Sequence, residues 1–129
     1  MNSTIELLRS HRSIRKFTPE PLAEGLLEQL CEAAQCAATS SFLQGATMVR
    51  VTSPEDRAVL ARCAGGQGYV ESAAEFLVLC ADLKRAGNYC KKYDKPFEGD
   101  YTEQFIIATV DVALMAQNLV IAAGSEGLG

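Results

Sequence analysis

The feature that most constrains the fold is a long apolar segment at residues 105–123. Its length would suit a transmembrane helix, but three polar residues, Asp111, Gln117 and Asn118, interrupt it. We therefore predict a buried helix of a soluble protein, at about residues 102–124. A helix that is apolar on nearly every side needs packing partners all round, so this segment is expected at the centre of the fold.

Local signals predict further helices at residues 4–10, 22–38, 54–64 and 82–93. Ser3 and Glu6 have the spacing of a capping box at the start of the first helix. Leucines and small residues recur every three or four positions in the second. Ser53 is the expected cap of the third, which Gly65 and Gly66 end, and the fourth is a charged stretch.

Two strands are predicted among these helices. Residues 47–52 alternate between apolar and polar side chains, as in a half-buried strand. Residues 75–81 are almost entirely apolar, as in a strand buried on both faces. Helices and strands intermixed in 129 residues, with 48% hydrophobic content, indicate one α/β or α+β domain with a single core.

Charge and cysteine content narrow the class of protein. The net charge of −4 argues against a general binder of nucleic acid or anionic membranes, because the basic residues are local. Five cysteines without any Cys-x-x-Cys pair lack the usual spacing of metal ligands and indicate thiols in a reducing compartment. The N-terminus shows no secretory signal pattern. We therefore expect a cytoplasmic protein without a bound metal.

The main candidate binding residues form a basic cluster near the N-terminus. Arg12 and Arg15 each offer a planar fork of donors that can hold a phosphate in bidentate fashion. His11 and Ser13 add neutral donors between them. The alternatives are a solvated surface, or arginines that pair with nearby acids such as Glu20 and Glu24. A nucleic-acid-binding arm is a third possibility, which the acidic net charge and the lack of interleaved aromatic residues oppose.

A second candidate is the hydroxyl-rich loop of Thr39, Ser40 and Ser41, which an apolar pair and Gln44 follow. Taken alone, such a run usually makes a turn. The sequence has one histidine and no nucleophile elbow or Walker loop, so no catalytic side chain is predicted. If the protein is an enzyme, a bound cofactor is expected to supply the chemistry.

Taken in order, these segments resemble a known family. The order is the His11–Arg15 cluster, the hydroxyl loop with Gln44, the glycines before Gln67, the polar residues of the long apolar segment, and a Gly-Leu-Gly run at 127–129. It resembles the FMN-dependent nitroreductases, in particular their oxygen-insensitive, NADPH-using branch. The resemblance implies an α+β fold with a central mixed β-sheet flanked by helices, in an intertwined homodimer.

The resemblance also assigns roles to residues. It implies that His11, Arg12, Ser13, Ile14 and Arg15 hold the phosphate and ribityl chain of FMN. Thr39, Ser40 and Ser41 would contact the flavin of the partner subunit, with Gln44 close by. Gln67 would lie near the flavin ring or the ribityl hydroxyls. Thr39 stands where many members have serine, a change that keeps the hydroxyl.

The activity implied is the transfer of two electrons from NADPH, through FMN, to a nitroaromatic, a quinone or a free flavin. Members of this branch are longer, so residues 1–129 would be the N-terminal portion of a single nitroreductase domain. The alternative is a non-catalytic product: an inactive remnant, or a module that binds flavin or another phosphorylated ligand. In the longer family members the rest of the chain would supply packing partners for the apolar helix. Without those partners, residues 1–129 expressed alone are expected to aggregate or form an unstable oligomer.

Overall fold

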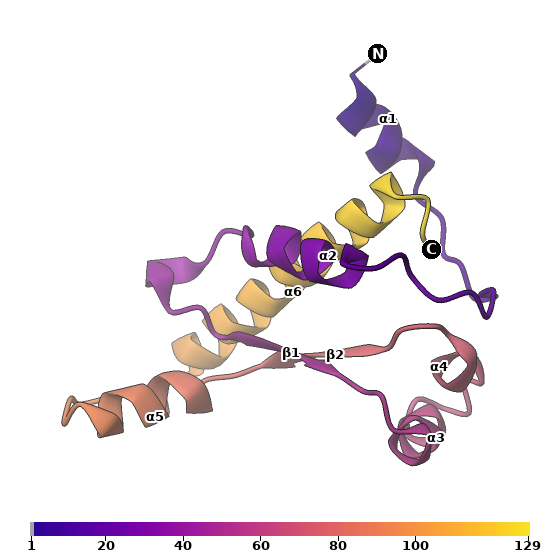
Figure 1. Ribbon diagram of the computed structural model, residues 1–129. Coiled ribbons are helices and arrows are strands. Elements are labelled where there is room, and N and C mark those ends of the chain that lie inside the picture. Colours follow the sequence, from indigo (N-terminus) through magenta and orange to yellow (C-terminus); the bar gives the residue numbers. More distant parts are fainter. Residues whose placement is uncertain (1) are drawn as a thin grey trace.

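A computed structural model describes residues 2–129. The larger helices are α1 (Ser3–Ser10), α2 (Leu26–Gln35), α3 (Pro54–Cys63), α5 (Lys84–Lys92) and α6 (Thr102–Ser125). A short helix α4 (Tyr69–Ser72) and a 3₁₀ turn η1 (Ser40–Phe42) complete the helical elements, and the strands are β1 (Ala46–Arg50) and β2 (Leu77–Ala81). In Figure 1, α2 crosses in front of α6, the strand pair lies below α2, and α5 projects to one side.

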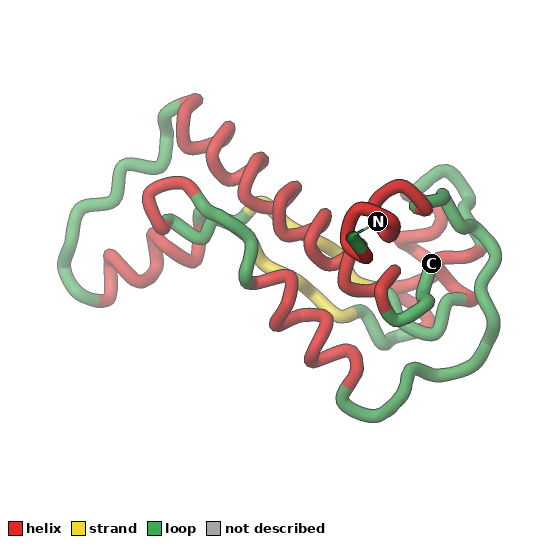
Figure 2. The backbone as a smooth tube through the Cα atoms, turned by 90° about the horizontal axis from the view of Figure 1, so that it is seen from above, coloured by secondary structure: helices red, strands yellow, loops and turns green. Residues whose placement is uncertain are grey.

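The two strands form an antiparallel pair. Ala46 lies opposite Ala81 and Arg50 lies opposite Leu77, and one further backbone bond, from Val51 N to Phe76 O (3.0 Å), extends the pairing. Figure 2 shows the strands side by side, with the helical connection between them at one end. Where a central mixed sheet is expected, residues 2–129 supply one antiparallel pair.

The main core lies where α6 crosses α2 and the strands, a smaller cluster lies where α3 meets α4, and most of the buried side chains are small. The buried apolar residues are Leu30, Ala34, Ala46, Ala61, Val70 and Ala108. A Cβ atom placed on Gly45 would come within 3.1 Å of the Ala108 Cβ, so the chain entering β1 lies directly on α6. On the other side, the Asn118 side chain of α6 donates to the Ala33 carbonyl of α2 at 3.4 Å.

The apolar helix is found where the sequence predicts it, but the prediction that it is buried is wrong for the described residues. Its buried residues are Ala108 and Asp111, whereas Phe105 is 66% exposed and Ile106 54% exposed. The reason is that α2 and the strands cover only part of its circumference. By length and composition α6 could also cross a membrane, a test that core helices of soluble proteins pass as well.

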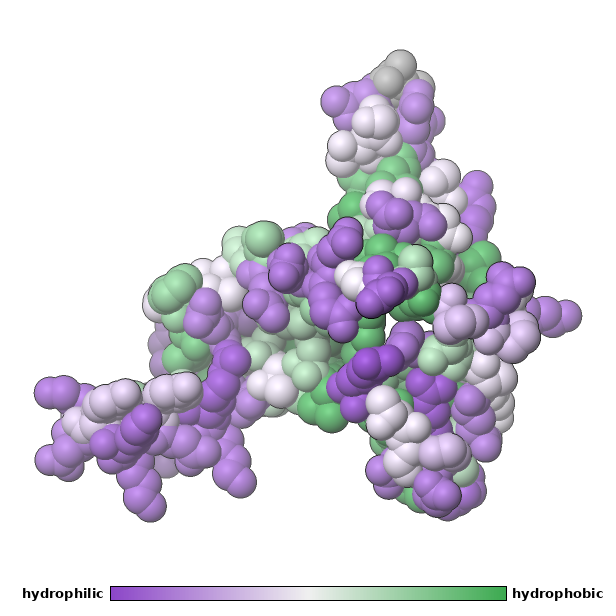
Figure 3. Space-filling model, viewed as in Figure 1, coloured by the Kyte–Doolittle hydropathy of each residue, from purple (hydrophilic) through white to green (hydrophobic). Residues whose placement is uncertain are grey.

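The second strand likewise departs from its prediction. Residues 77–80 are half-buried and Ala81 is exposed, because α6 is the helix that packs against β2 and it covers one face of the strand. Figure 3 shows hydrophobic residues exposed around the middle of the molecule and below α1, and a mostly hydrophilic α5. Apolar surface that the sequence assigns to the core is therefore exposed.

Helix ends follow local chemistry. Ser53 caps α3 as predicted, since its hydroxyl accepts from the Asp56 N–H at 3.2 Å. Gly65 and Gly66 follow the helix with φ of +82° and +79°, left-handed values that glycine adopts without steric cost. The third predicted helix is confirmed at both ends.

Two other helix starts are corrected. The cap of α1 is Asn2 rather than Ser3, because the Asn2 side chain accepts from Thr4 N at 2.9 Å. Helix α2 begins at Leu26 instead of residue 22, after Gly25 with φ of +76°. The left-handed Gly25 interrupts a periodicity that would otherwise continue through it.

Candidate functional site

The predicted basic cluster leaves α1 as an extended, exposed segment. Residues 11–16 are all exposed, and His11 forms the C-cap of α1 with extended backbone angles (φ −50°, ψ 136°). No hydrogen bond or ion pair to another described residue engages the side chains of His11, Ser13 or Arg15. The alternative in which Arg15 pairs with Glu20 or Glu24 therefore has no support within residues 2–129.

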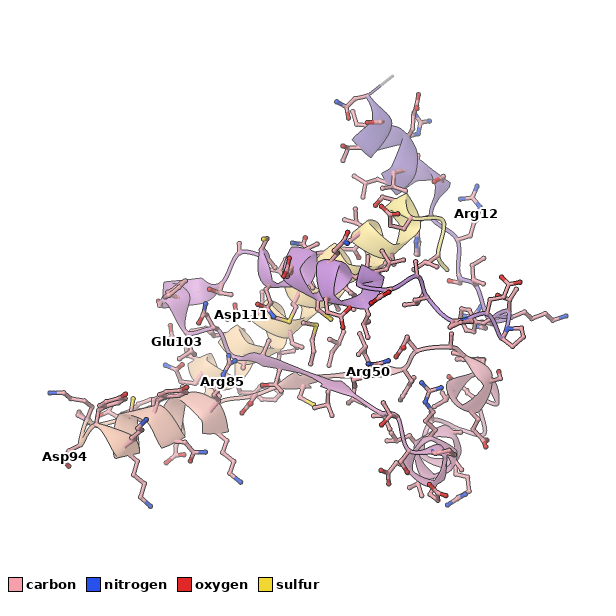
Figure 4. The ribbon with its side chains drawn as sticks, in the orientation of Figure 1. Arg12, Arg50, Arg85, Asp94, Glu103 and Asp111 are labelled. Carbon is pink, nitrogen blue, oxygen red and sulfur yellow. The ribbon has the colours of Figure 1, made fainter. Side chains whose placement is uncertain are left out.

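Arg12 has a structural role that the sequence did not predict. Its Nη1 donates to the carbonyls of Arg9 (3.4 Å), Ser10 (3.3 Å) and His11 (2.7 Å). These carbonyls lie at the C-terminal end of α1, which favours a positive charge. Figure 4 shows Arg12 beside this end of the helix. Arg12 therefore presents its guanidinium from a fixed position, with one nitrogen already committed.

Ile14 joins the cluster to the chain after α6. A Cβ atom on Gly129 would lie 2.7 Å from Ile14 Cγ1, so these two segments are in direct contact. Gly127 has φ of +74°, a left-handed turn that brings the chain back from α6. Two motifs far apart in the sequence, at 11–15 and 127–129, thus meet at one end of α6.

Gln67 is linked to the basic segment through the side chains of Tyr69 and Phe17. Its side-chain carbonyl accepts from the Tyr69 hydroxyl. The Tyr69 ring meets Phe17 edge to face, with centroids 6.1 Å apart and an interplanar angle of 72°. Because Phe17 follows Arg15 by two positions, this chain of contacts places Gln67 with the basic segment.

The donors gathered here suit a phosphate group with a polar tail. Arg15 offers an uncommitted guanidinium fork, and His11 and Ser13 add neutral donors within the same exposed segment. The Gln67 side chain can bond to hydroxyl groups. Among the described residues, no carboxylate pairs with Arg12, Ser13 or Arg15. An incoming anion would therefore not have to displace a carboxylate.

The predicted hydroxyl loop has an unusual backbone. Thr39 is extended (φ −129°), the 3₁₀ turn Ser40–Phe42 follows, and Ser41, Phe42 and Gln44 have φ of 51°, 54° and 54°. Left-handed conformations are uncommon for residues other than glycine. Ser40, Ser41 and Gln44 are exposed, and Phe42 is 79% exposed. The loop therefore presents its polar side chains to solvent from a strained backbone.

Asp111 of α6 holds this loop. It is 1% exposed, and its Oδ1 and Oδ2 accept from the backbone N–H groups of Ser40 (3.1 Å) and Gly45 (3.4 Å). Sequence reasoning treated Asp111 only as an interruption of an apolar run. The available signal was the carboxylate itself, since a charge inside an apolar helix needs buried donors.

A second anchor comes from the end of β2 and the start of α5. The Arg85 guanidinium donates to the Gln44 carbonyl, and Asp82 N donates to the Gly45 carbonyl at 2.9 Å. The Asp82 carboxylate accepts from the Thr47 hydroxyl (2.6 Å) and from Arg85 N (3.1 Å). These bonds, that of Thr47 first, lower the pKa of Asp82. Asp111 and Arg85 both lie beside the chain that leads into β1 (Figure 4).

One chain does not bring the two groups of predicted site residues together. The loop contacts α6 at Ala108 and Asp111, whereas α1, which leads into the basic segment, contacts it at Gly124 through Leu7. At 1.5 Å per residue, these contacts are about 20 Å apart along the helix. His11–Arg15 and Gln67 form one group, and Thr39–Gln44 forms the other.

Comparison with known proteins identifies the family. The model of the Nitroreductase family matches residues 8–129. This chain belongs to the nitroreductase family. A nitroreductase fold is also found by structural comparison: the structure of B. megaterium NfrA1 superposes with a TM-score of 0.94 at 43% identity, over 99% of this chain and 53% of that one.

The nitroreductases that resemble this chain include a Vibrio harveyi NADPH-flavin oxidoreductase, 46% identical over 100% of this chain and 52% of the relative. An oxygen-insensitive NADPH nitroreductase of Salmonella typhimurium is 43% identical, again over 100% of this chain and 52% of the relative. A solved structure of the Vibrio harveyi NADPH:FMN oxidoreductase complexed with NAD+ superposes with a TM-score of 0.93 at 46% identity, over 99% of this chain and 54% of that one. The chain thus spans about half the length of the curated relatives it matches.

Proposed function

We propose that this chain contributes the FMN-binding part of an oxidoreductase that passes electrons from NADPH to nitroaromatics, quinones or flavins. Its membership of the nitroreductase family supports the reaction class, and the relatives' names support NADPH and flavin as reactants. The observation that carries the proposal is the exposed donor set at residues 11–15, whose Arg15, Ser13 and His11 have no partner among the described residues.

In this proposal the basic segment binds the cofactor. Arg15 would hold the FMN phosphate through its guanidinium fork, assisted by Ser13 and His11, while Arg12 would add charge from its place at the end of α1. Ile14 would keep the segment in place by its contact with Gly129. When bound, FMN supplies the two-electron carrier between donor and acceptor. No side chain is needed as a general acid or base.

The remaining site residues would come from a second copy of the chain. Thr39, Ser40, Ser41 and Gln44 lie about 20 Å along α6 from the end that carries the basic segment. We therefore propose a homodimer in which this loop contacts the partner's FMN, and in which Gln67 acts within its own subunit. The exposed apolar side chains of α6 support such an association.

We also propose that residues 1–129 make up the N-terminal portion of a single nitroreductase domain, because they match half the length of the relatives. A cytoplasmic location is proposed as well, since the cysteines are free and Cys36 and Cys63 are exposed thiols. The competing function is a non-catalytic flavin-binding or phosphate-binding module, which the same donor set at residues 11–15 would serve.

The test is FMN binding by the full-length protein, followed through the quenching of flavin fluorescence. We expect saturable binding, and Arg15→Ala should raise Kd at least tenfold, because a charge-assisted hydrogen bond contributes about 1.5–3 kcal/mol. Lys91→Ala, an exposed cation on α5, is the matched control and should leave Kd unchanged. A folded protein that does not bind FMN would refute the proposal, and binding without NADPH oxidation would favour the non-catalytic module.

A further inference from the structure

The loop that contains η1 depends on a buried carboxylate of another element. Asp111 is 1% exposed, and none of the described cations forms an ion pair with it. A buried charge is tolerated only when hydrogen bonds compensate the loss of water. The compensation comes from the backbone N–H groups of Ser40 and Gly45. These donors stand at the two ends of the loop, so one side chain fixes both.

The loop has a strained backbone, and bonds from Asp111, Arg85 and Asp82 add to its own. Ser41, Phe42 and Gln44 have positive φ, which non-glycine residues rarely adopt without outside support. Within the loop, backbone bonds connect Leu43 N to Ser40 O (3.0 Å) and Ala46 N to Gln44 O (2.8 Å). The bonds to Asp111 join this strained turn to α6, the central helix of the fold.

We propose that Asp111 is a positioning residue for the flavin half-site on the loop. By accepting from Ser40 N and Gly45 N, it sets where the Ser40 and Ser41 hydroxyls and the Gln44 amide stand. The inference rests on the proposed function, in which those groups contact the partner's FMN. A carboxylate is required because both groups that face it are donors. An asparagine would keep one acceptor and turn an N–H toward the other donor.

The first test is Asp111→Asn in the full-length protein. We expect Kd for FMN to rise about tenfold, because one of the two hydrogen bonds from the loop to the side chain at position 111 is replaced by a donor–donor contact. Amide hydrogen exchange at Ser40 and Gly45 should accelerate at the same time. Thr109→Val is the control on the same helix: the Thr109 hydroxyl is exposed and donates to Phe105 O within α6, at 2.7 Å, so neither readout should change.

A second variant displaces the loop without touching the carboxylate, in case Asp111→Asn does not fold. The added Cβ of Gly45→Ala would meet the Ala108 Cβ at 3.1 Å and the Ala108 Cα at 3.2 Å, which pushes the loop away from α6. We expect weaker FMN binding. Adding Ala108→Gly removes the closer contact and should restore part of the affinity, a rescue that general destabilisation would not produce.

The outcomes separate this inference from the proposed function. If the unmodified protein binds FMN and the folded Asp111→Asn and Gly45→Ala variants bind it with the same Kd, Asp111 does not position the half-site, even if both variants melt at lower temperature. If the folded, unmodified protein binds no FMN, the proposed function fails. Hydrogen exchange at Ser40 and Gly45 then decides: faster exchange in Asp111→Asn supports loop positioning by Asp111, and unchanged exchange overturns it.

Discussion

Asp82 shows how one carboxylate can support the loop that leads into β1. It accepts from the Thr47 hydroxyl and from Arg85 N, and the Arg85 side chain reaches the Gln44 carbonyl. These bonds favour the ionised form and lower the pKa of Asp82. A group whose pKa is lower in the folded state stabilises the fold above its unfolded-state value, about 3.9 for aspartate, and loses that contribution as the pH falls.

Asp82→Asn should therefore destabilise the protein more at neutral pH than in acid. We expect a lower midpoint in urea for Asp82→Asn than for the unmodified full-length protein at pH 7. The two midpoints should approach each other as the pH falls below about 4, because the unfolded chain then binds a proton at Asp82 while the lowered pKa keeps the folded carboxylate ionised. Urea unfolding across this pH range checks the result. A difference that stays constant with pH would contradict it.

At the scale of residues, the sequence predicts side chains that can bind a ligand more readily than it predicts the side chains that hold them in position. The cluster at 11–15 and the hydroxyl loop were predicted because their residues are neighbours in the chain. Asp111 was missed, because its bonds to Ser40 and Gly45 span 71 and 66 positions. The hydrogen bonds of Arg12 to the last carbonyls of α1 were also not predicted, although the end of that helix was.

At the scale of elements, the buried arginine Arg57 ties α3 to both strands. It is 9% exposed and donates to the carbonyls of Val51 (2.9 Å), Ala73 (2.5 Å) and Ala74 (3.4 Å). Val51 directly follows β1, and the two alanines lie between α4 and β2. One side chain thus closes the helical connection between the paired strands.

Arg57→Ala should destabilise the full-length protein by about 2–4 kcal/mol, because it removes charged hydrogen bonds and leaves half-buried carbonyls without a donor. The measurement is the free energy of unfolding in urea. Arg62→Ala, an exposed arginine of the same helix, should change it by no more than about 0.5 kcal/mol. Equal effects of the two substitutions would show that the carbonyl bonds of Arg57 contribute little.

Element boundaries were predicted best where a single residue determines them. Ser53 and the two glycines after α3 set its ends as expected, since capping and left-handed turns are local effects. The start of α2 was misplaced by four residues, because apolar spacing continues across Gly25 while the backbone turns left-handed there. The antiparallel pairing of β1 and β2 depends on contacts between segments distant in the sequence. The spacing of apolar residues along the chain does not predict such contacts.

At the scale of the whole molecule, the exposed apolar surface is the main departure from the sequence prediction. Phe105, Ile106 and Val110 are at least half exposed on α6, and Ile5 is 49% exposed on α1. The composition of α6 predicts a helix that needs partners on many sides. It cannot indicate whether those partners lie within residues 1–129, and the structure shows that α2 and the strands cover one part of the helix.

Residues 1–129 expressed alone should therefore self-associate. We expect size-exclusion chromatography with light scattering to give a mass above that of the 13.9 kDa monomer, because large exposed apolar patches promote association. A double substitution, Ile106→Lys with Val110→Lys, should reduce the self-association by placing charge on the exposed face. A monodisperse monomer with a sharp thermal transition would contradict this expectation.

The separation of the two groups of site residues along α6 has a genetic consequence. In the proposed homodimer, each of two identical pockets takes its basic segment from one subunit and its loop from the other. A subunit defective at Arg15 and a subunit defective at Asp111 would then complement each other when they assemble: one pocket would inherit both lesions and the other neither. Two alleles that each weaken FMN binding in every pocket would together give a mixed dimer in which half of the pockets are wild-type.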